Sequence, residues 1–230
     1  MIQFPSPTRS ETGRGLVPFI TQRAGEEAAP ANLHILRELR GGYRLFYGDE
    51  DVRDRPLRGL LWARCSFTHD EHGMPTGEPQ WKMMHPYRQM LTMLAGRCQI
   101  CTRPAKTPLG YVYMAGPGDE DPSQESILTN QPPVCARHVR TVQALCPHMQ
   151  GEPLVILTSS APMHGVMGTV YGMDQGGGVV PVASPKEPLR FDDVRAPLML
   201  ASQLVRRLSQ FRVMTVAELL DELDAVEGEP

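Results

Sequence analysis

Two short segments, Cys98-Gln99-Ile100-Cys101 and Cys135-Ala136-Arg137-His138, decide the fold that the sequence predicts. Each segment carries two metal-ligating side chains separated by two residues, and 33 residues lie between the segments. Two intervening residues allow a tight turn in which the flanking side chains converge on one cation. The spacing therefore predicts a metal centre formed by Cys98, Cys101, Cys135 and His138, with zinc as the metal.

Four protein ligands leave no coordination position open, which predicts a structural metal and not a catalytic one. Five cysteines, an odd number, favour a reducing compartment over a disulfide framework. Cys146 and His148 are further metal-ligating residues, but Cys146 lies eleven residues after Cys135, about 16 Å along a continuous helix. We therefore exclude both from the centre.

The segments around the ligands predict the order ligand turn, hairpin and helix. Apolar side chains at helical spacing predict a helix from His85-Pro86 to Ala95, which delivers the chain into the first ligand turn. Apolar runs predict strands at 110–115 and 126–129 that pair as a hairpin. A helix from about 134 to 145 then places Cys135 and His138 on one face of its first turn. We refer to residues 98–148 as the predicted zinc module.

This order of elements resembles the treble-clef group of zinc proteins over most of the predicted zinc module. That group includes the HNH endonucleases, in which an Asn precedes a Cys-x-x-Cys-His segment, as Asn130 precedes Cys135 here. If His138 replaces the second cysteine, Val139 stands where that family carries its helix histidine, and the strand at 111–115 lacks the family's His pair. The resemblance therefore implies a similar but catalytically degenerate scaffold, because no group remains to activate water.

A longer stretch, from Gly59 to Leu208, resembles an actinobacterial family with no assigned activity. The resemblance depends on three segments: His85-Pro86-Tyr87-Arg88-Gln89, Pro132-Pro133-Val134-Cys135 and Leu145-Cys146-Pro147-His148. It implies a zinc-bearing unit and supplies no mechanism.

The N-terminal third predicts few regular elements. Residues 1–32 are rich in Pro, Ser, Thr, Gly and Ala and predict a flexible N-terminal arm. Leucines at 33, 36 and 39 predict a short helix over 32–40 that ends at Gly41-Gly42. Runs at 43–47 and 59–65 predict two strands of a long-looped hairpin.

The C-terminal third predicts a small antiparallel sheet followed by two helices. β-rich runs at 154–158, 165–171 and 179–182 are separated by Gly and Pro. Four apolar residues, Leu200, Leu204, Leu208 and Phe211, form one stripe of a predicted helix over 196–212. Thr215 and Glu218 form a capping box for the last helix. The fold class predicted is α+β, with residues 33–230 as one compact unit and the small sheet and two helices within 151–230.

A second group of metal-ligating residues consists of Cys65, His69, His72 and His85. Their spacing permits a second metal site, which would be the place for a catalytic metal. The stretch is polar and rich in turns, so solvated histidines are the expectation we favour.

Five basic residues surround the predicted centre: Arg97, Arg103, Lys106, Arg137 and Arg140. They could contact phosphates of a nucleic acid. Three thiolates on Zn²⁺ carry a net negative charge, however, and we favour neutralisation of that charge as the role of these arginines.

Composition excludes several functional classes. The formal charge of −3 and a pI near 6.2 provide no global attraction to nucleic acids or anionic lipids. No apolar run reaches the roughly 20 residues that a membrane helix needs, so we expect a cytoplasmic protein without a membrane partner. The function that these features favour is a non-catalytic, zinc-binding regulatory or interaction protein with an unknown protein or nucleic-acid partner. The alternatives are an enzyme of specialised metabolism or nucleic-acid processing that uses the residues at 65–85, and a DNA-binding protein.

Overall fold

The computed structural model describes residues 17–29, 32–39, 41–146, 149 and 151–227, and it shows an α+β fold with mostly antiparallel sheets. The predicted fold class is thus confirmed at that level. The helices of the described part are α1 (Pro86–Ala95), α2 (Ala136–Leu145) and α3 (Val216–Glu227). The strands are β1 (Thr21–Arg23), β2 (Leu33–Arg37), β3 (Tyr43–Tyr47), β4 (Leu61–Trp62), β5 (Pro79–Met84), β6 (Tyr111–Ala115), β7 (Ser126–Thr129), β8 (Leu154–Ser160), β9 (Met163–Met173), β10 (Val179–Ala183), β11 (Leu189–Arg190) and β12 (Met199–Met214).

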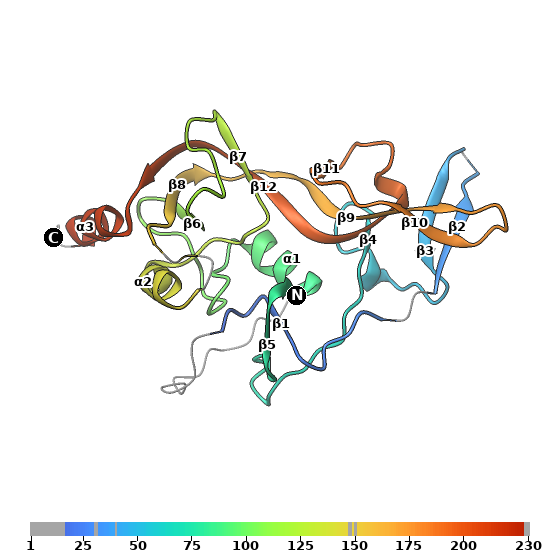
Figure 1. Cartoon of the computed structure of the whole chain (residues 1–230), viewed down its shortest axis with the longest axis horizontal. Helices are drawn as coiled ribbons and strands as arrows, with labels where there is room; N and C mark the ends of the chain where they lie inside the picture. Colours follow the sequence, from blue (N-terminus) through green and yellow to red (C-terminus); the bar gives the residue numbers. More distant parts are fainter. Residues whose placement is uncertain (1–16, 30–31, 40, 147–148, 150, 228–230) are drawn as a thin grey trace.

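A long antiparallel ribbon spans the molecule (Figure 1). One side of the ribbon is β12, and the other side is β9 followed by β8. At one end, Val170 of β9 pairs with Met199 of β12, and at the other end Val155 of β8 pairs with Met214 of β12. The helix predicted over 196–212 is therefore wrong, apart from one 3₁₀ turn at Ala196–Leu198. A spacing of four residues keeps side chains on one helix face, but it also keeps them on one strand face. The leucine spacing therefore does not distinguish the two structures, although bulges between Ala201 and Gln203 and between Val205 and Arg206 place Leu200, Leu204 and Leu208 in three different clusters. Within the described residues, one C-terminal helix, α3, follows.

The opposite edge of β12 is paired in pieces. β4 lies parallel to it at Leu200 and Ala201, and β7 is antiparallel to it from Arg206 to Ser209. The predicted hairpin of 110–115 with 126–129 is wrong, because β7 pairs with β12 and β6 pairs with β8. Between β4 and β7, the buried side chain of Gln89 replaces a strand: its Oε1 accepts from Leu204 N and its Nε2 donates to Leu204 O, both at 2.9 Å.

The helix α1 has the predicted bounds and is fixed at both ends. His85 is its N-cap, and Gly96 terminates it with a φ of 58°, a left-handed conformation that glycine adopts without strain. The guanidinium of Arg206, from β12, donates to the carbonyls of Met93 and Ala161. A cation at these C-terminal carbonyls stabilises the helix dipole and ties α1 to the ribbon.

Two regions of the N-terminal third differ from prediction. The helix predicted over 32–40 is wrong: β2 and β3 form a hairpin, and Gly41 and Gly42 form its turn with φ near +90°. The long-looped hairpin of 43–47 with 59–65 is also wrong, because β4 pairs with β12. Within the arm expected over 1–32, residues 17–29 are packed onto the protein, with β1 paired to β5 and Phe19 and Ile20 buried. Residues 1–16, 30 and 31 lie outside the described part.

Two hydrophobic cores lie along the ribbon. The metal-side core packs α2 and α3 against β6 and β8, and it includes Ile100, Val112, Val139, Leu157 and Leu219. The α1 core packs α1 against β9 and β12, and it includes Trp62, Met90, Met93, Val166 and Leu204.

Candidate metal centre

The first ligand turn is formed by backbone hydrogen bonds between Cys98 and Arg103. The Cys98 N–H donates to the Arg103 carbonyl at 2.8 Å, and the Thr102 N–H donates to the Cys98 carbonyl at 2.9 Å. Thr102 closes the turn in a left-handed conformation with a φ of 59°. This geometry directs the Cys98 and Cys101 side chains into the metal-side core, where both are buried.

The second ligand pair sits at the start of α2. Cys135 is the N-cap and His138 lies in the first turn, as the sequence predicts. The Val134 N–H donates to the Val112 carbonyl at 2.8 Å, which fixes the segment before α2 against β6. Gln99 joins the two pairs, because its N–H donates to the Pro133 carbonyl at 3.0 Å and its side-chain amide donates to the Pro132 carbonyl at 2.9 Å.

The four predicted ligands come together. The Cys135 Sγ lies 3.2 Å from His138 Nδ1, and the Cys101 Sγ lies 3.9 Å from the Cys135 Sγ. The Cys98 Sγ is 3.9 Å from His138 Nδ1, and all four ligand atoms lie within 4.8 Å of one another. Such a buried group of three cysteines and one histidine could hold a metal ion as a structural site.

The electrostatics of the group favour a cation. Hydrogen bonds from the thiols of Cys135 and Cys98 lower the pKa of Cys101. Hydrogen bonds with Cys101 and then with Cys135 raise the pKa of His138 to about 9. Hydrogen bonds with the same two residues also raise the pKa of Cys98. A bound metal ion replaces the shared protons and requires all three thiolates.

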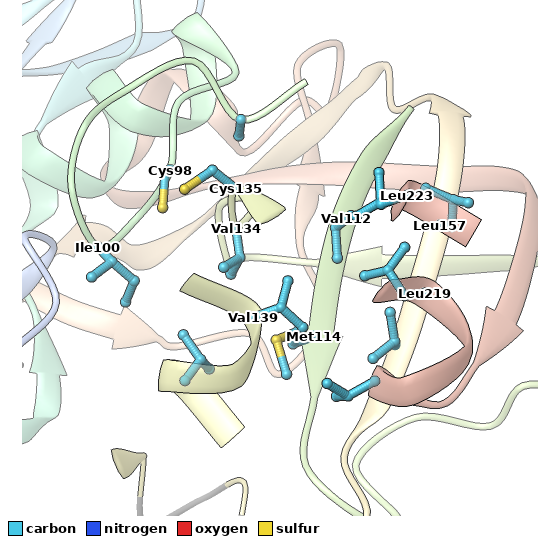
Figure 2. Close-up of a cluster of buried hydrophobic side chains, with 14 of the residues drawn as sticks. Cys98, Ile100, Val112, Met114, Val134, Cys135, Val139, Leu157, Leu219 and Leu223 are labelled. Atoms are coloured by element: carbon cyan, nitrogen blue, oxygen red, sulfur yellow. The ribbon is translucent and has the colours of Figure 1, made fainter. Parts of the chain in front are cut away.

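The centre adjoins the apolar core directly. Figure 2 shows the Cys98 and Cys135 side chains beside Val134, within the same cluster as Val139 and Met114. Val139, at the position that the HNH resemblance assigns to a catalytic histidine, has no exposed surface. Its side chain is core, so that position offers nothing to a substrate. Among the described residues, no other Cys, His, Asp or Glu joins the four ligands.

The alternative second metal site does not assemble, although all of residues 65–85 are described. His69 and His72 are exposed, and Cys65 is half-buried. His85 is completely buried and uses both ring nitrogens: Nδ1 accepts from the Arg88 N–H at 3.4 Å, and Nε2 donates to the Ser66 carbonyl at 3.1 Å. The structure therefore gives His85 a role as helix cap instead of metal ligand.

The exclusion of Cys146 agrees with the structure, which places it at the C-cap of α2 and outside the ligand group. His148 lies outside the described residues.

A cavity of about 480 Å³ lies beside the first ligand turn, and sequence analysis did not identify it. Gln99 and Ile100 form part of its wall, together with Trp81, Met83 and Met84 from β5. The methionines between residues 83 and 93 were the signal in the sequence that could have indicated this cavity. Met90 and Met93 are fully buried in the α1 core, but Met83 is 52 % exposed, which is more than core packing requires.

Within the residues that the structure describes, no helix is long and apolar enough to cross a membrane. No protein-family profile, curated protein or solved structure matches this chain.

Proposed function

We propose that this chain is a non-catalytic binding protein in which Zn²⁺, held by Cys98, Cys101, Cys135 and His138, is a structural element. The observation that carries the proposal is a closed set of four ligands, of which the three cysteines are buried in a hydrophobic core and His138 is half-buried. A catalytic zinc keeps one coordination position for water or substrate, whereas a fourth protein ligand occupies that position here.

The separations between ligand atoms support zinc. Tetrahedral coordination with Zn–S bonds of about 2.3 Å and a Zn–N bond of about 2.0 Å requires sulfur–sulfur separations of about 3.8 Å and sulfur–nitrogen separations of about 3.5 Å. The sulfur–sulfur separation of Cys101 and Cys135 is 3.9 Å. The His138 Nδ1 lies 3.9 Å from the Cys98 sulfur and 3.2 Å from the Cys135 sulfur, so all three separations are close to these values. Thiolate and imidazole ligands also disfavour Mg²⁺ and Ca²⁺, which prefer oxygen.

The local topology supports a treble-clef arrangement of the zinc module. The ligand turn is followed by β6, whose Val112 bridges antiparallel to Val134, and the chain then enters the ligand-bearing α2. In this arrangement, residues 116–132 are an insertion between the two paired segments, and they include β7.

The cavity beside the ligand turn supports a binding role. Because Gln99 and Ile100 lie between two zinc ligands and also form a wall of the cavity, zinc binding determines the shape of that wall. The cavity is within the size range of small-molecule sites in proteins, and its lining combines Trp81 and Met83 with the carboxyl of Glu120.

The test is metal analysis combined with unfolding. We expect one zinc per purified chain, and we expect chelation to lower the unfolding temperature and to abolish the fold of the predicted zinc module. Cys65→Ser is the matched control, because Cys65 is half-buried and is not a ligand. A chain that retains its thermal unfolding transition without metal contradicts the structural role, and two zinc ions per chain, one of them exchangeable, favour the enzyme alternative.

Nucleic-acid binding is the second candidate, and one observation favours it. Arg103, Lys106, Arg137 and Arg140 are exposed around the centre, and within the described part of the chain none of them forms an ion pair. A gel shift with a salt series tests this function, because binding through phosphates must weaken steeply as salt increases. Salt-independent binding, or none, excludes it.

A further inference from the structure

A second hollow, of about 460 Å³, lies away from the metal centre, where β9, β11 and β12 run side by side. Its polar lining is mainly cationic and consists of Arg58, His164, Arg190, Asp192 and Arg207, with Phe191 as an apolar wall. Three guanidinium groups thus face one carboxylate, in a protein whose formal charge is −3.

Strand pairing places these cations next to one another. Arg190 in β11 pairs with Gly165 in β9, directly after His164. Arg207 in β12 lies across from Pro162, whose carbonyl accepts from the Arg207 N–H at 3.0 Å. Gly165 permits the close approach of β11, because a Cβ at this position would lie 2.1 Å from the Leu189 carbonyl oxygen.

Among the described residues, two of the three arginines form no ion pair with a carboxylate. Asp192 accepts from Arg190 Nε at 3.2 Å, but no ion pair among the described residues involves Arg58 or Arg207. The Arg58 guanidinium instead lies 4.8 Å from the centre of the Phe191 ring. This stacking orients the group and leaves its N–H donors available.

Cations that line one hollow repel each other, and an anion bound between them removes that repulsion. The same positive field acts on His164, because burial, and then Arg190 and Arg207, lower its pKa. The chain therefore concentrates positive charge at this hollow and supplies one carboxylate to offset it.

We propose that this hollow binds the phosphoryl group of a small phosphorylated molecule. Guanidinium groups donate paired hydrogen bonds in a planar geometry that matches phosphate oxygens, and here they come from three separate elements: the turn at Arg58, β11 and β12. The hollow has room for more than the phosphate itself, with Phe191 and Met163 available to the rest of the ligand. The hollow is partly open to solvent, and its cations line a single volume of about 460 Å³, which fits a small molecule better than the extended backbone of a nucleic acid.

The experiment is a calorimetric titration of the full-length zinc-loaded protein with inorganic pyrophosphate at constant ionic strength. A second titration, with the same ligand, follows the backbone amide chemical shifts by NMR. We expect saturable binding, shift changes at residues 164–166, 190 and 207, and affinity at least roughly tenfold lower in Arg207→Gln and Arg58→Gln, since each loses a charge-assisted hydrogen bond.

Arg103→Gln is the control, because it removes an exposed arginine beside the metal centre and we expect it to bind pyrophosphate as the unaltered protein does. Far-UV circular dichroism confirms that each variant is folded. Three results overturn the proposal: no saturable binding, an equal loss of affinity in Arg103→Gln, or citrate binding more tightly than pyrophosphate, which would assign the hollow to carboxylates. Tighter binding of a DNA oligonucleotide that Arg207→Gln abolishes would also overturn it in favour of a nucleic acid.

Discussion

The metal centre and the buried ion pair behind α1 both place charged groups inside the protein, but they stabilise them by different means. At the centre, four side chains from two segments lie where they could hold one cation. Behind α1, Arg88 forms two hydrogen bonds to Glu26, at 2.5 and 2.6 Å, and both side chains are almost completely buried. The first region offers ligands for an external ion, whereas the second uses only groups of the chain.

Further hydrogen bonds join the ion pair to its surroundings, although the Arg88 Nε is buried without a partner among the described residues. Arg88 also donates to the Thr21 carbonyl at 2.8 Å, and Glu26 accepts from the backbone N–H groups of Arg23 and Thr68 at 2.8 and 3.1 Å. Burial alone would raise the pKa of Glu26, but these hydrogen bonds, led by Arg88, lower it. The pair therefore anchors residues 17–29 to α1 without a metal.

The largest expected effect comes from removing one metal ligand, which tests whether the two regions unfold separately. Cys101→Ser or Cys135→Ser should unfold at least residues 98–146, because structural zinc contributes about 10 kcal/mol or more, which is comparable with the whole stability of a domain. Hydrogen exchange measures the result: amides of α2 and β6 should lose protection. Protection in α1 tests the comparison, since retained protection shows that the two regions unfold separately.

A smaller effect follows from breaking the ion pair. Glu26→Gln should lower the free energy of unfolding by about 3–5 kcal/mol, because it leaves the guanidinium of Arg88 buried without its counter-charge. Zinc content should remain one per chain. The double variant Glu26→Gln/Arg88→Met should recover part of the loss in a denaturant titration, and a double variant less stable than Glu26→Gln alone would contradict the assignment.

The α1 region should also lose stability in acid through His85. Burial, and then the charge of Arg88, lower the pKa of His85 to about 4 from an ordinary value of 6.5. A base with a lowered folded-state pKa contributes stability above pH 6.5, and that contribution falls as the pH decreases toward 4, by up to about 3 kcal/mol.

His85→Asn keeps a capping side chain for α1 and removes the titration. Denaturant titrations from pH 7 to pH 4.5 should show a smaller loss of stability for His85→Asn than for the unaltered protein. Equal slopes for the two proteins would assign the acid sensitivity to the metal centre.

The smallest expected effect concerns the N-terminal cap of α3, at the edge of the metal-side core. The Thr215 Oγ1 accepts from the Glu218 N–H at 3.2 Å, and Glu218 accepts from the Thr215 N–H at 2.7 Å, which confirms the predicted capping box of α3. Thr215→Ala should cost about 1 kcal/mol, and thermal unfolding should show it without a change in zinc content. Loss of zinc would show that α3 is needed for the centre itself.

The sequence predicts the centre far better than it predicts the ion pair, for a physical reason. Metal ligands lie at short, recognisable spacings, whereas Glu26 and Arg88 are 62 residues apart and no local pattern joins them. The helices α1, α2 and α3 are predictable from periodicity and caps. The partner of a strand is not, since β7 and β6 have suitable sequences for a hairpin but pair elsewhere. The cationic hollow is hidden for the same reason, because only strand pairing brings Arg58, Arg190 and Arg207 to one place.

β12 carries a consequence for biosynthesis. Its side chains contribute to every hydrophobic cluster of the described protein: Leu200 beside Leu45 and Leu61, Leu204 in the α1 core, Leu208 beside Tyr113 and Ile127, and Met214 against the metal-side core. The ribosome makes β12 after all the other strands, so each cluster stays incomplete on the nascent chain until residues 199–214 have emerged. The cysteines of the centre are therefore synthesised about 60 to 100 residues before the strand that completes their surroundings. During this interval the finished fold does not yet bury the thiols of Cys98, Cys101 and Cys135, which it covers once it is complete.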